Sequence, residues 1–221
     1  MGKLIVIEGL DGSGKATQAE LLTNALKEAG KKVRKVTFPN YESDSSALVK
    51  MYLSGVFGSK PSDVNAYAAS TFYSVDRYAS YKTQWQSFYQ NDGIIVADRY
   101  TTSNAVHQCS KLPQQEWDKY LEWLLDLEFN KIGIPTPDCV IYLDMSPEVS
   151  QKLMSKRYAG QEEKKDIHEK NVDYLNASRK AAVYCSQKLG WQKIACDDAK
   201  TPYTIDQIGK MVYEAVNKIV F

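Results

Sequence analysis

Short apolar runs alternate along the chain with longer stretches of helical spacing. Five of these runs are predicted to be β-strands: Lys3–Glu8, Lys32–Phe38, Gly93–Asp98, Asp138–Asp144 and Trp191–Cys196. The first, third and fourth are rich in Val and Ile and almost continuously apolar, which is typical of parallel strands covered on both faces. Because strands that alternate with helices need crossover connections, the pattern predicts an α/β fold with a five-stranded parallel sheet flanked by helices.

The stretches between the runs carry apolar residues at helical spacing. One predicted helix follows the first strand and ends at Gly30; its apolar stripe comprises Ala19, Leu22, Leu26 and Ala29. Another lies near the C-terminus, with a stripe of Ile205, Ile208, Val212 and Val216. A long helical stretch is predicted over Tyr67–Tyr89, and residues 159–165 lack an apolar face and are predicted to form a surface loop.

Length and charge narrow the class of protein. The 221 residues are 43% hydrophobic and 25% charged, which is an ordinary globular composition, and we expect a single domain over residues 1–221. Lys and Arg number 28 against 27 Asp and Glu, so we expect no nucleic-acid partner. No apolar run approaches the roughly 20 residues that span a bilayer, and the first residues are interpreted as a buried strand rather than a signal peptide, so we expect no membrane partner.

The cysteines indicate a reducing compartment. Cys109, Cys139, Cys185 and Cys196 are scattered, form no CxxC pair and, with only two histidines in the chain, show no zinc-ligand spacing. We expect buried free thiols and a cytoplasmic protein.

The strongest motif is a glycine loop. Residues 9–17 read GLDGSGKAT and match GxxxxGK between a strand and a helix. Glycines let backbone amides approach phosphate oxygens, while the helix N-terminus and the lysine supply positive charge. The loop therefore predicts a nucleoside triphosphate site, formed by Gly9, Gly12, Ser13, Gly14, Lys15, Ala16 and Thr17. The alternative is a tight glycine turn with a solvent-exposed lysine.

One position of the loop departs from the usual pattern. Ala16 stands where Ser or Thr usually holds Mg²⁺, and Thr17 points in another direction around the helix. The metal must then be held by Asp11 or a more distant acid, with water in between. Asp98 ends the third strand, where an open α/β sheet places its ligands, so it either faces the metal or caps the next helix.

Other clusters leave two interpretations open. Arg77 lies among aromatic residues, including Tyr73, and would either contact a planar base or belong to the core. Ser103 and Asn104 would either read a ligand or simply initiate the helix after the third strand. Two charged pairs also stay ambiguous: Lys156 with Arg157 is a basic site or a solvated face, and Asp166 with Glu169 is a site or compensates a helix dipole.

Together the motifs resemble the thymidylate kinases, enzymes that move the γ-phosphoryl group of ATP onto dTMP. The matching segments are GLDGSGKATQ at 9–18, FPNY at 38–41, FYSVDR at 72–77, IIVADRYTTSNA at 94–105, VIYLDMSPE at 140–148, and a DxxE at 166–169 before a helix with Arg179 and Tyr184. The resemblance covers residues 3 to about 215. It implies a three-layer P-loop kinase fold with a lid over about 156–166, ATP as co-substrate, Mg²⁺ and a homodimer.

The resemblance also implies roles for the matching residues. Lys15, Arg99, Arg157 and Asp11 would be catalytic. Contacts to dTMP would come from Asp11, Phe38, Tyr41, Tyr73, Arg77, Arg99, Ser103, Asn104, His107 and Asp166. The metal would lie near Asp11, Asp98 and Glu169. The loop lacks an Arg of its own, and family members of this kind carry basic residues in the lid, which fits Arg157 with Lys164 or Lys165. His107 replaces the tyrosine that family members often have beside the sugar.

Alternatives to this activity remain. The chain could be another nucleoside or nucleotide kinase of the same fold, although Arg77 and Arg99 favour an anionic acceptor with a planar base. A nucleotide-dependent switch would hydrolyse ATP without an acceptor, and the sequence has no guanine-reading NKxD-type motif. A paralogue that has lost activity is the third possibility, suggested by Ala16. For the homodimer, the helical stretches Tyr67–Tyr89 and Trp117–Leu127 offer apolar area, and the alternative is that this area belongs to the buried core.

Overall fold

A parallel β-sheet of five strands forms the centre of the protein. The structure, a computed structural model, describes the backbone of residues 1–157 and 172–220 and the side chains of residues 1–153 and 174–220. The strands are β1 (Lys3–Gly9), β2 (Val33–Thr37), β3 (Ile94–Asp98), β4 (Cys139–Asp144) and β5 (Gln192–Ala195). They are all parallel, in the order β2-β3-β1-β4-β5. The predicted α/β fold is confirmed.

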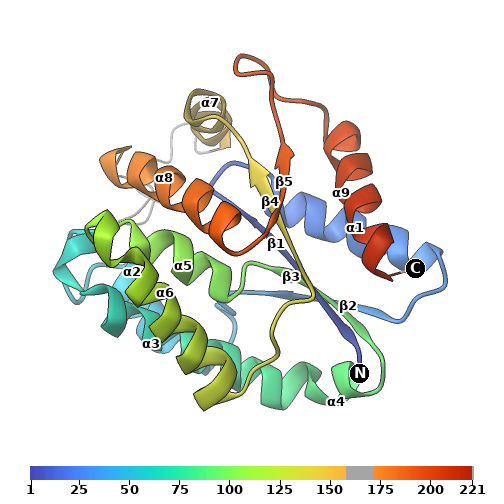
Figure 1. The fold of residues 1–221 in the computed structure, drawn as a ribbon, viewed down its shortest axis with the longest axis horizontal. Coiled ribbons are helices and arrows are strands. Elements are labelled where there is room, and N and C mark those ends of the chain that lie inside the picture. Colours follow the sequence, from blue (N-terminus) through green and yellow to red (C-terminus); the bar gives the residue numbers. More distant parts are fainter. Residues whose placement is uncertain (158–171, 221) are drawn as a thin grey trace.

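Helices cover both faces of this sheet. They are α1 (Lys15–Glu28), α2 (Ala47–Leu53), α3 (Ala66–Ser80), α4 (Gln86–Gln90), α5 (Thr101–Cys109), α6 (Trp117–Leu125), α7 (Pro147–Arg157), α8 (Val172–Lys188) and α9 (Ile205–Val220). Two π-helical segments extend the set, η3 (Tyr81–Trp85) after α3 and η5 (Asp126–Ile132) after α6. Figure 1 shows α1 and α9 on one side of the twisted sheet and α3, α5, α6 and α8 on the other.

Alternation along β1 explains the two faces. Ile5 and Ile7 pack in one core cluster with α1 and α9, while Leu4 and Val6 pack in another with side chains from β3 and η3. Successive strand residues point to opposite faces, and on β1 both faces are apolar and fully covered. This is why the strand reads as a continuous apolar run in the sequence.

Two predicted stripes are shorter in the structure than in the sequence. Ala29 is the exposed C-cap of α1, just before Gly30 turns the chain with a φ of 76°. Ile205 begins α9 and is 56% exposed, because the first turn of the helix lies beyond the core. The remaining stripe residues of both helices are buried as predicted.

All four cysteines are free and buried, as predicted. Contact with Cys185 and burial raise the pKa of Cys109, at the place where α5 packs on α8. Burial raises the pKa of Cys139 to about 11 and that of Cys196 to about 12.

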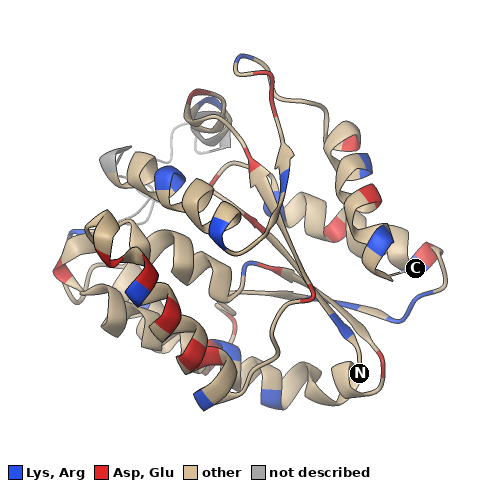
Figure 2. Ribbon diagram, in the orientation of Figure 1, with Lys and Arg blue, Asp and Glu red and all other residues tan. Residues whose placement is uncertain are grey.

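Charged residues lie mainly on the outer helices. Acidic and basic positions alternate along α6 and α9 (Figure 2). Among the residues that the structure describes, no helix is both long enough and apolar enough to span a bilayer.

Candidate active site

The glycine loop connects β1 directly to α1 at the carboxyl edge of the sheet. Gly12 and Gly14 adopt φ angles of 82° and 84°, which a residue with a Cβ atom rarely does. Gly14 caps α1 without a side-chain hydrogen bond, so N–H groups of the first turn remain available to an anion. Ser13 Oγ is buried and finds no hydrogen-bond partner within the described part of the chain. A phosphate oxygen would supply the missing partner, so the loop suits a polyphosphate.

Lys15 lies buried inside this loop. Its Nζ donates to the carbonyl of Leu10 at 2.8 Å and lies 3.7 Å from the carboxylate of Asp11. Burial and the nearby Arg99 guanidinium lower the pKa of Lys15. A bound phosphate would favour the ammonium form, because it brings negative charge beside the amine.

Arg99 links the end of β3 to the glycine loop. Its guanidinium pairs with the carboxylate of Asp11 and reaches Ser103 Oγ at 3.3 Å and His107 Nε2 at 3.4 Å. Its φ of 68° is unusual for a residue with a side chain, and such strain is concentrated at functional sites. Burial opposes the charge, but the carboxylates of Asp11 and Glu8 outweigh it and raise the pKa of Arg99.

Glu8 is a site residue that the sequence patterns do not single out. It is 1% exposed and accepts hydrogen bonds from the Gly9 N–H at 2.9 Å, Thr102 Oγ1 at 2.6 Å and Ser103 Oγ at 2.8 Å. It also lies 3.7 Å from Arg99. The carboxylate therefore ties the glycine loop to α5. One sequence signal could have identified Glu8: an acidic residue stands inside an apolar strand, directly before the glycine loop. Such a residue is notable because buried charges are rare unless they are paired.

The loop after β2 lies against α3. Phe38 is buried against Tyr100, with ring centroids 5.8 Å apart, and Tyr41 is exposed. Asp76 holds the loop in place, because its carboxylate accepts the N–H of Asn40 at 2.8 Å and the Ser45 hydroxyl at 2.6 Å. The FPNY and FYSVDR motifs are thus joined through a direct contact.

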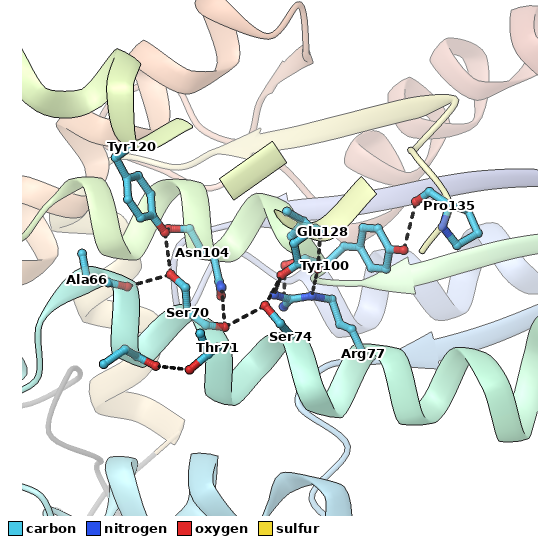
Figure 3. A network of polar contacts seen from close by, with 12 residues as sticks. Ala66, Ser70, Thr71, Ser74, Arg77, Tyr100, Asn104, Tyr120, Glu128 and Pro135 are labelled. Atoms are coloured by element: carbon cyan, nitrogen blue, oxygen red, sulfur yellow. Dashed lines mark hydrogen bonds and ion pairs between the residues drawn. The ribbon is translucent and has the colours of Figure 1, made fainter. Parts of the chain in front are cut away.

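A polar network joins α3 to α5 (Figure 3). Arg77 is 1% exposed and forms an ion pair with Glu128 from η5. Burial opposes the charge, but Glu128 outweighs it and raises the pKa of Arg77. Asn104 Nδ2 donates to the Ser70 carbonyl at 3.2 Å. Nothing in the sequence patterns points to Glu128, because it belongs to no motif and contacts Arg77 from 51 positions away.

Two predicted contact residues lie beside tyrosine rings. Tyr73 is half-buried and meets Tyr52 edge-on, with centroids 6.5 Å apart. The His107 ring is buried and stacks on Tyr174 at 6.0 Å, and the Tyr174 hydroxyl donates to the His107 carbonyl at 3.0 Å.

The structure therefore brings most of the predicted residues to one region. Lys15, Asp11, Arg99, Ser103 and His107 form a connected cluster at the carboxyl edge of the sheet. Arg77 and Asn104 lie in the adjoining α3–α5 network, and Asp98 is buried at the end of β3. Asp166 and Glu169 fall outside the described residues, as does the side chain of Arg157.

The described residues fit a magnesium ion held mainly by phosphate and water. No group of three or more acidic, histidine or cysteine residues suited to a metal occurs among them. Mg²⁺ in phosphoryl-transfer sites is commonly bound by one or two carboxylates together with substrate phosphates. Asp11 belongs to the glycine loop and Asp98 ends β3, and both carboxylates act on Lys15, so they could supply such ligands.

A parallel sheet whose first strand passes through a GxxxxGK loop into a helix defines a P-loop nucleotide-binding protein. A family model described as thymidylate kinase matches residues 7–202. The chain belongs to the thymidylate kinase family.

Individual relatives agree with this assignment. A thymidylate kinase of Mycobacterium tuberculosis (strain ATCC 25618 / H37Rv) is 31% identical over 195 residues, which cover 85% of this chain and 87% of that protein. A thymidylate kinase of Homo sapiens is 29% identical over 144 residues, or 65% of this chain and 61% of that protein. The structure of a thymidylate kinase from Candida albicans matches with a TM-score of 0.72 at 21% identity, covering 99% of this chain and 92% of that one, and supports the fold.

Proposed function

We propose that the chain transfers the γ-phosphoryl group of ATP to dTMP and produces dTDP. The observation that carries this proposal is the convergence of Lys15, from the glycine loop, and Arg99, from the end of β3, on the carboxylate of Asp11. One cation serves the donor phosphates and the other the acceptor phosphate, so the two nucleotides would meet between them.

The reaction needs little covalent chemistry from the protein. The acceptor is already an anionic phosphate, so no strong general base is required, and catalysis rests on positioning and charge. Lys15 would neutralise the donor phosphates, Arg99 would orient the acceptor phosphate, and Arg157 would stabilise the charge that develops between them. Mg²⁺, held through phosphate oxygens and by Asp11, Asp98 or Glu169, supplies further neutralisation of the polyphosphate when bound.

The nucleobase would lie between the loop after β2 and the helices α3 and α5. Phe38 and Tyr73 would border the ring, while Arg77 and Asn104 would supply polar groups at its edge. Tyr41, Ser103, His107 and Asp166 would lie nearer the sugar and phosphate. The segment of about 156–166 would act as a lid, because water must be excluded if ATP hydrolysis is to be avoided.

An acceptor panel tests the activity. Initial rates of ADP formation with ATP and Mg²⁺ would be compared for dTMP, dUMP, dGMP, dCMP and thymidine, with a reaction lacking any acceptor. We expect dTMP to be the best substrate and turnover to depend on it. ATP turnover without an acceptor would favour a nucleotide switch, and a preference for thymidine would contradict the role of Arg99.

The lid arginine has its own test. Arg157→Ala is expected to lower kcat far more than it weakens dTMP binding, because the charge it meets develops in the transition state. An unchanged kcat would contradict this role.

We also propose a homodimer in the cytoplasm. Apolar side chains are exposed on and around α2 and α3: Leu48, Met51, Val56, Phe57, Val75 and Tyr78. A second copy of the chain would cover such a surface. Sedimentation velocity at micromolar concentration should show a dimer that Val75→Glu shifts to monomer; a wild-type monomer would reject the proposal.

A further inference from the structure

Glu128 is fully buried and makes contacts that the proposed reaction does not explain. It comes from η5, a segment that holds none of the substrate-contacting residues proposed above. Its carboxylate is 0% exposed and accepts hydrogen bonds from Ser74 Oγ at 2.6 Å, Arg77 Nε at 3.0 Å and Thr101 Oγ1 at 3.1 Å. It also forms an ion pair with Arg77 Nη2 (Figure 3).

These contacts fix the plane of the Arg77 guanidinium. Nε and Nη2 both bond Glu128, while Nη1 faces the carbonyl of Tyr100 at 3.4 Å. A guanidinium is planar, so a carboxylate that holds two of its nitrogens also sets the direction of its remaining N–H bonds. A lysine or a single hydrogen bond would leave that direction undetermined.

The same carboxylate also connects two helices. Ser74 and Arg77 lie on α3, and Thr101 is the first residue of α5. One helical turn earlier on α3, Ser70 Oγ contacts the Tyr120 hydroxyl at 2.7 Å, and that hydroxyl in turn donates to the Asn104 carbonyl at 3.4 Å. The continuous helix α6–η5 therefore contacts both α3 and α5 at two positions, through Tyr120 and through Glu128.

Stability alone is a poor explanation for this ion pair. Desolvating two charges costs about as much as their attraction returns, and apolar replacements are often neutral or stabilising. The best-attested use of such a pair is to specify one arrangement of the surrounding elements. Here the elements specified are α3 and α5, which carry Tyr73 and Arg77 on one side and Ser103 and Asn104 on the other.

We infer that Glu128 is a positioning residue that sets the nucleobase selectivity of the enzyme through Arg77 and the spacing of α3 and α5. This inference rests on the proposed function, because it assumes that the base lies between those helices. Glu128 does not touch the substrate. By fixing the Arg77 guanidinium, it keeps rigid the polar groups that face the base. A carbonyl at position 4 of a pyrimidine is then distinguished from an amine.

The test is the substitution Glu128→Gln, which keeps the shape and removes the charge. The matched control is Asp126→Asn, which removes an acid from the same segment; the Asp126 side chain is half-exposed and lies 3.6 Å from Lys131. Steady-state constants would be measured for ATP, dTMP and dCMP. For Glu128→Gln we expect KM for dTMP to rise about tenfold or more and the preference for dTMP over dCMP to fall by a similar factor, because a charge-assisted contact is lost. KM for ATP should change less than about threefold, and the control should resemble the wild type.

A second variant covers poor folding of the first. Ser74→Ala removes one hydrogen bond to Glu128 and keeps the ion pair, so KM for dTMP should rise about two- to fivefold in the same direction. A lowered melting temperature with unchanged KM for dTMP and unchanged selectivity, in either variant, would overturn the inference and leave Glu128 a structural residue. If the wild type itself does not phosphorylate dTMP, the proposed function fails instead.

Discussion

The substitution Glu8→Gln tests how the glycine loop is anchored to the sheet and to α5. The Glu8 carboxylate accepts the N–H of Gly9 at 2.9 Å and the hydroxyls of Thr102 and Ser103 at 2.6 and 2.8 Å. Glutamine keeps one acceptor oxygen, which can serve Gly9. Its amide nitrogen then replaces the oxygen to which both hydroxyls donate.

The expected loss in the free energy of unfolding follows from these contacts. A hydrogen bond to a charged group contributes about 1.5–3 kcal/mol, and the two hydroxyls recover part of the loss because they can rotate and accept. We therefore expect Glu8→Gln to lower the free energy of unfolding by about 2–4 kcal/mol. In a chain of this size 1 kcal/mol corresponds to about 2–4 °C in melting temperature, so the midpoint should fall by roughly 4–16 °C.

Thermal unfolding without nucleotide measures the effect, by calorimetry or circular dichroism. Glu20→Gln is the matched control, since Glu20 pairs with Lys35 at the surface. Exposed ion pairs contribute little, so the control should shift the midpoint by about 3 °C at most. If Glu8→Gln melts within about 2 °C of the wild type, the buried carboxylate does not anchor the loop and the reasoning is wrong.

Three further predictions concern Lys111, Gly9 and Lys15. Burial lowers the pKa of Lys111, which donates to the Tyr52 hydroxyl, from 10.5 to about 7. Because the unfolded state binds more protons than the folded state between these two pH values, the melting temperature should rise from pH 7 to 9 more in the wild type than in Lys111→Met. Parallel curves of melting temperature against pH would contradict this. In Gly9→Ala the new Cβ would lie 2.5 Å from Ser13 Oγ, so overpacking should cost about 1–3 kcal/mol in denaturant unfolding; an unchanged midpoint would show that the loop can move. Lys15→Met should leave the melting temperature unchanged or raise it, because a buried ammonium is removed. The same variant should lower kcat about 100-fold or more. Normal turnover would show that Lys15 has no part in the mechanism.

Features encoded over a few residues could be predicted from the sequence. The apolar runs of β1, β3 and β4 mark strands because both faces of each are covered, and the glycine loop marks its own position between a strand and a helix. The burial of all four cysteines followed from residue type alone.

Pairings between distant segments could not be predicted. Glu8 meets Thr102 from 94 positions away, and Glu128 meets Arg77 across 51, so no local spacing connects them. Arg77 shows the consequence: its aromatic neighbours suggested either a base contact or the core, while its buried carboxylate partner was invisible. Such partners are chosen by the packing of helices on the sheet, which pattern and propensity do not specify.

The four buried thiols give the protein an internal reporter of its own opening. The thiolate is the form of cysteine that attacks a thiol-modifying reagent. Burial and the raised pKa of Cys139 and Cys196 suppress this reaction in the folded state. Because Cys109 and Cys185 lie between α5 and α8 while Cys139 and Cys196 lie under α1 and α9, the two pairs sample opposite sides of the sheet. The order in which they become labelled would reveal which helical layer detaches first, with no added probe.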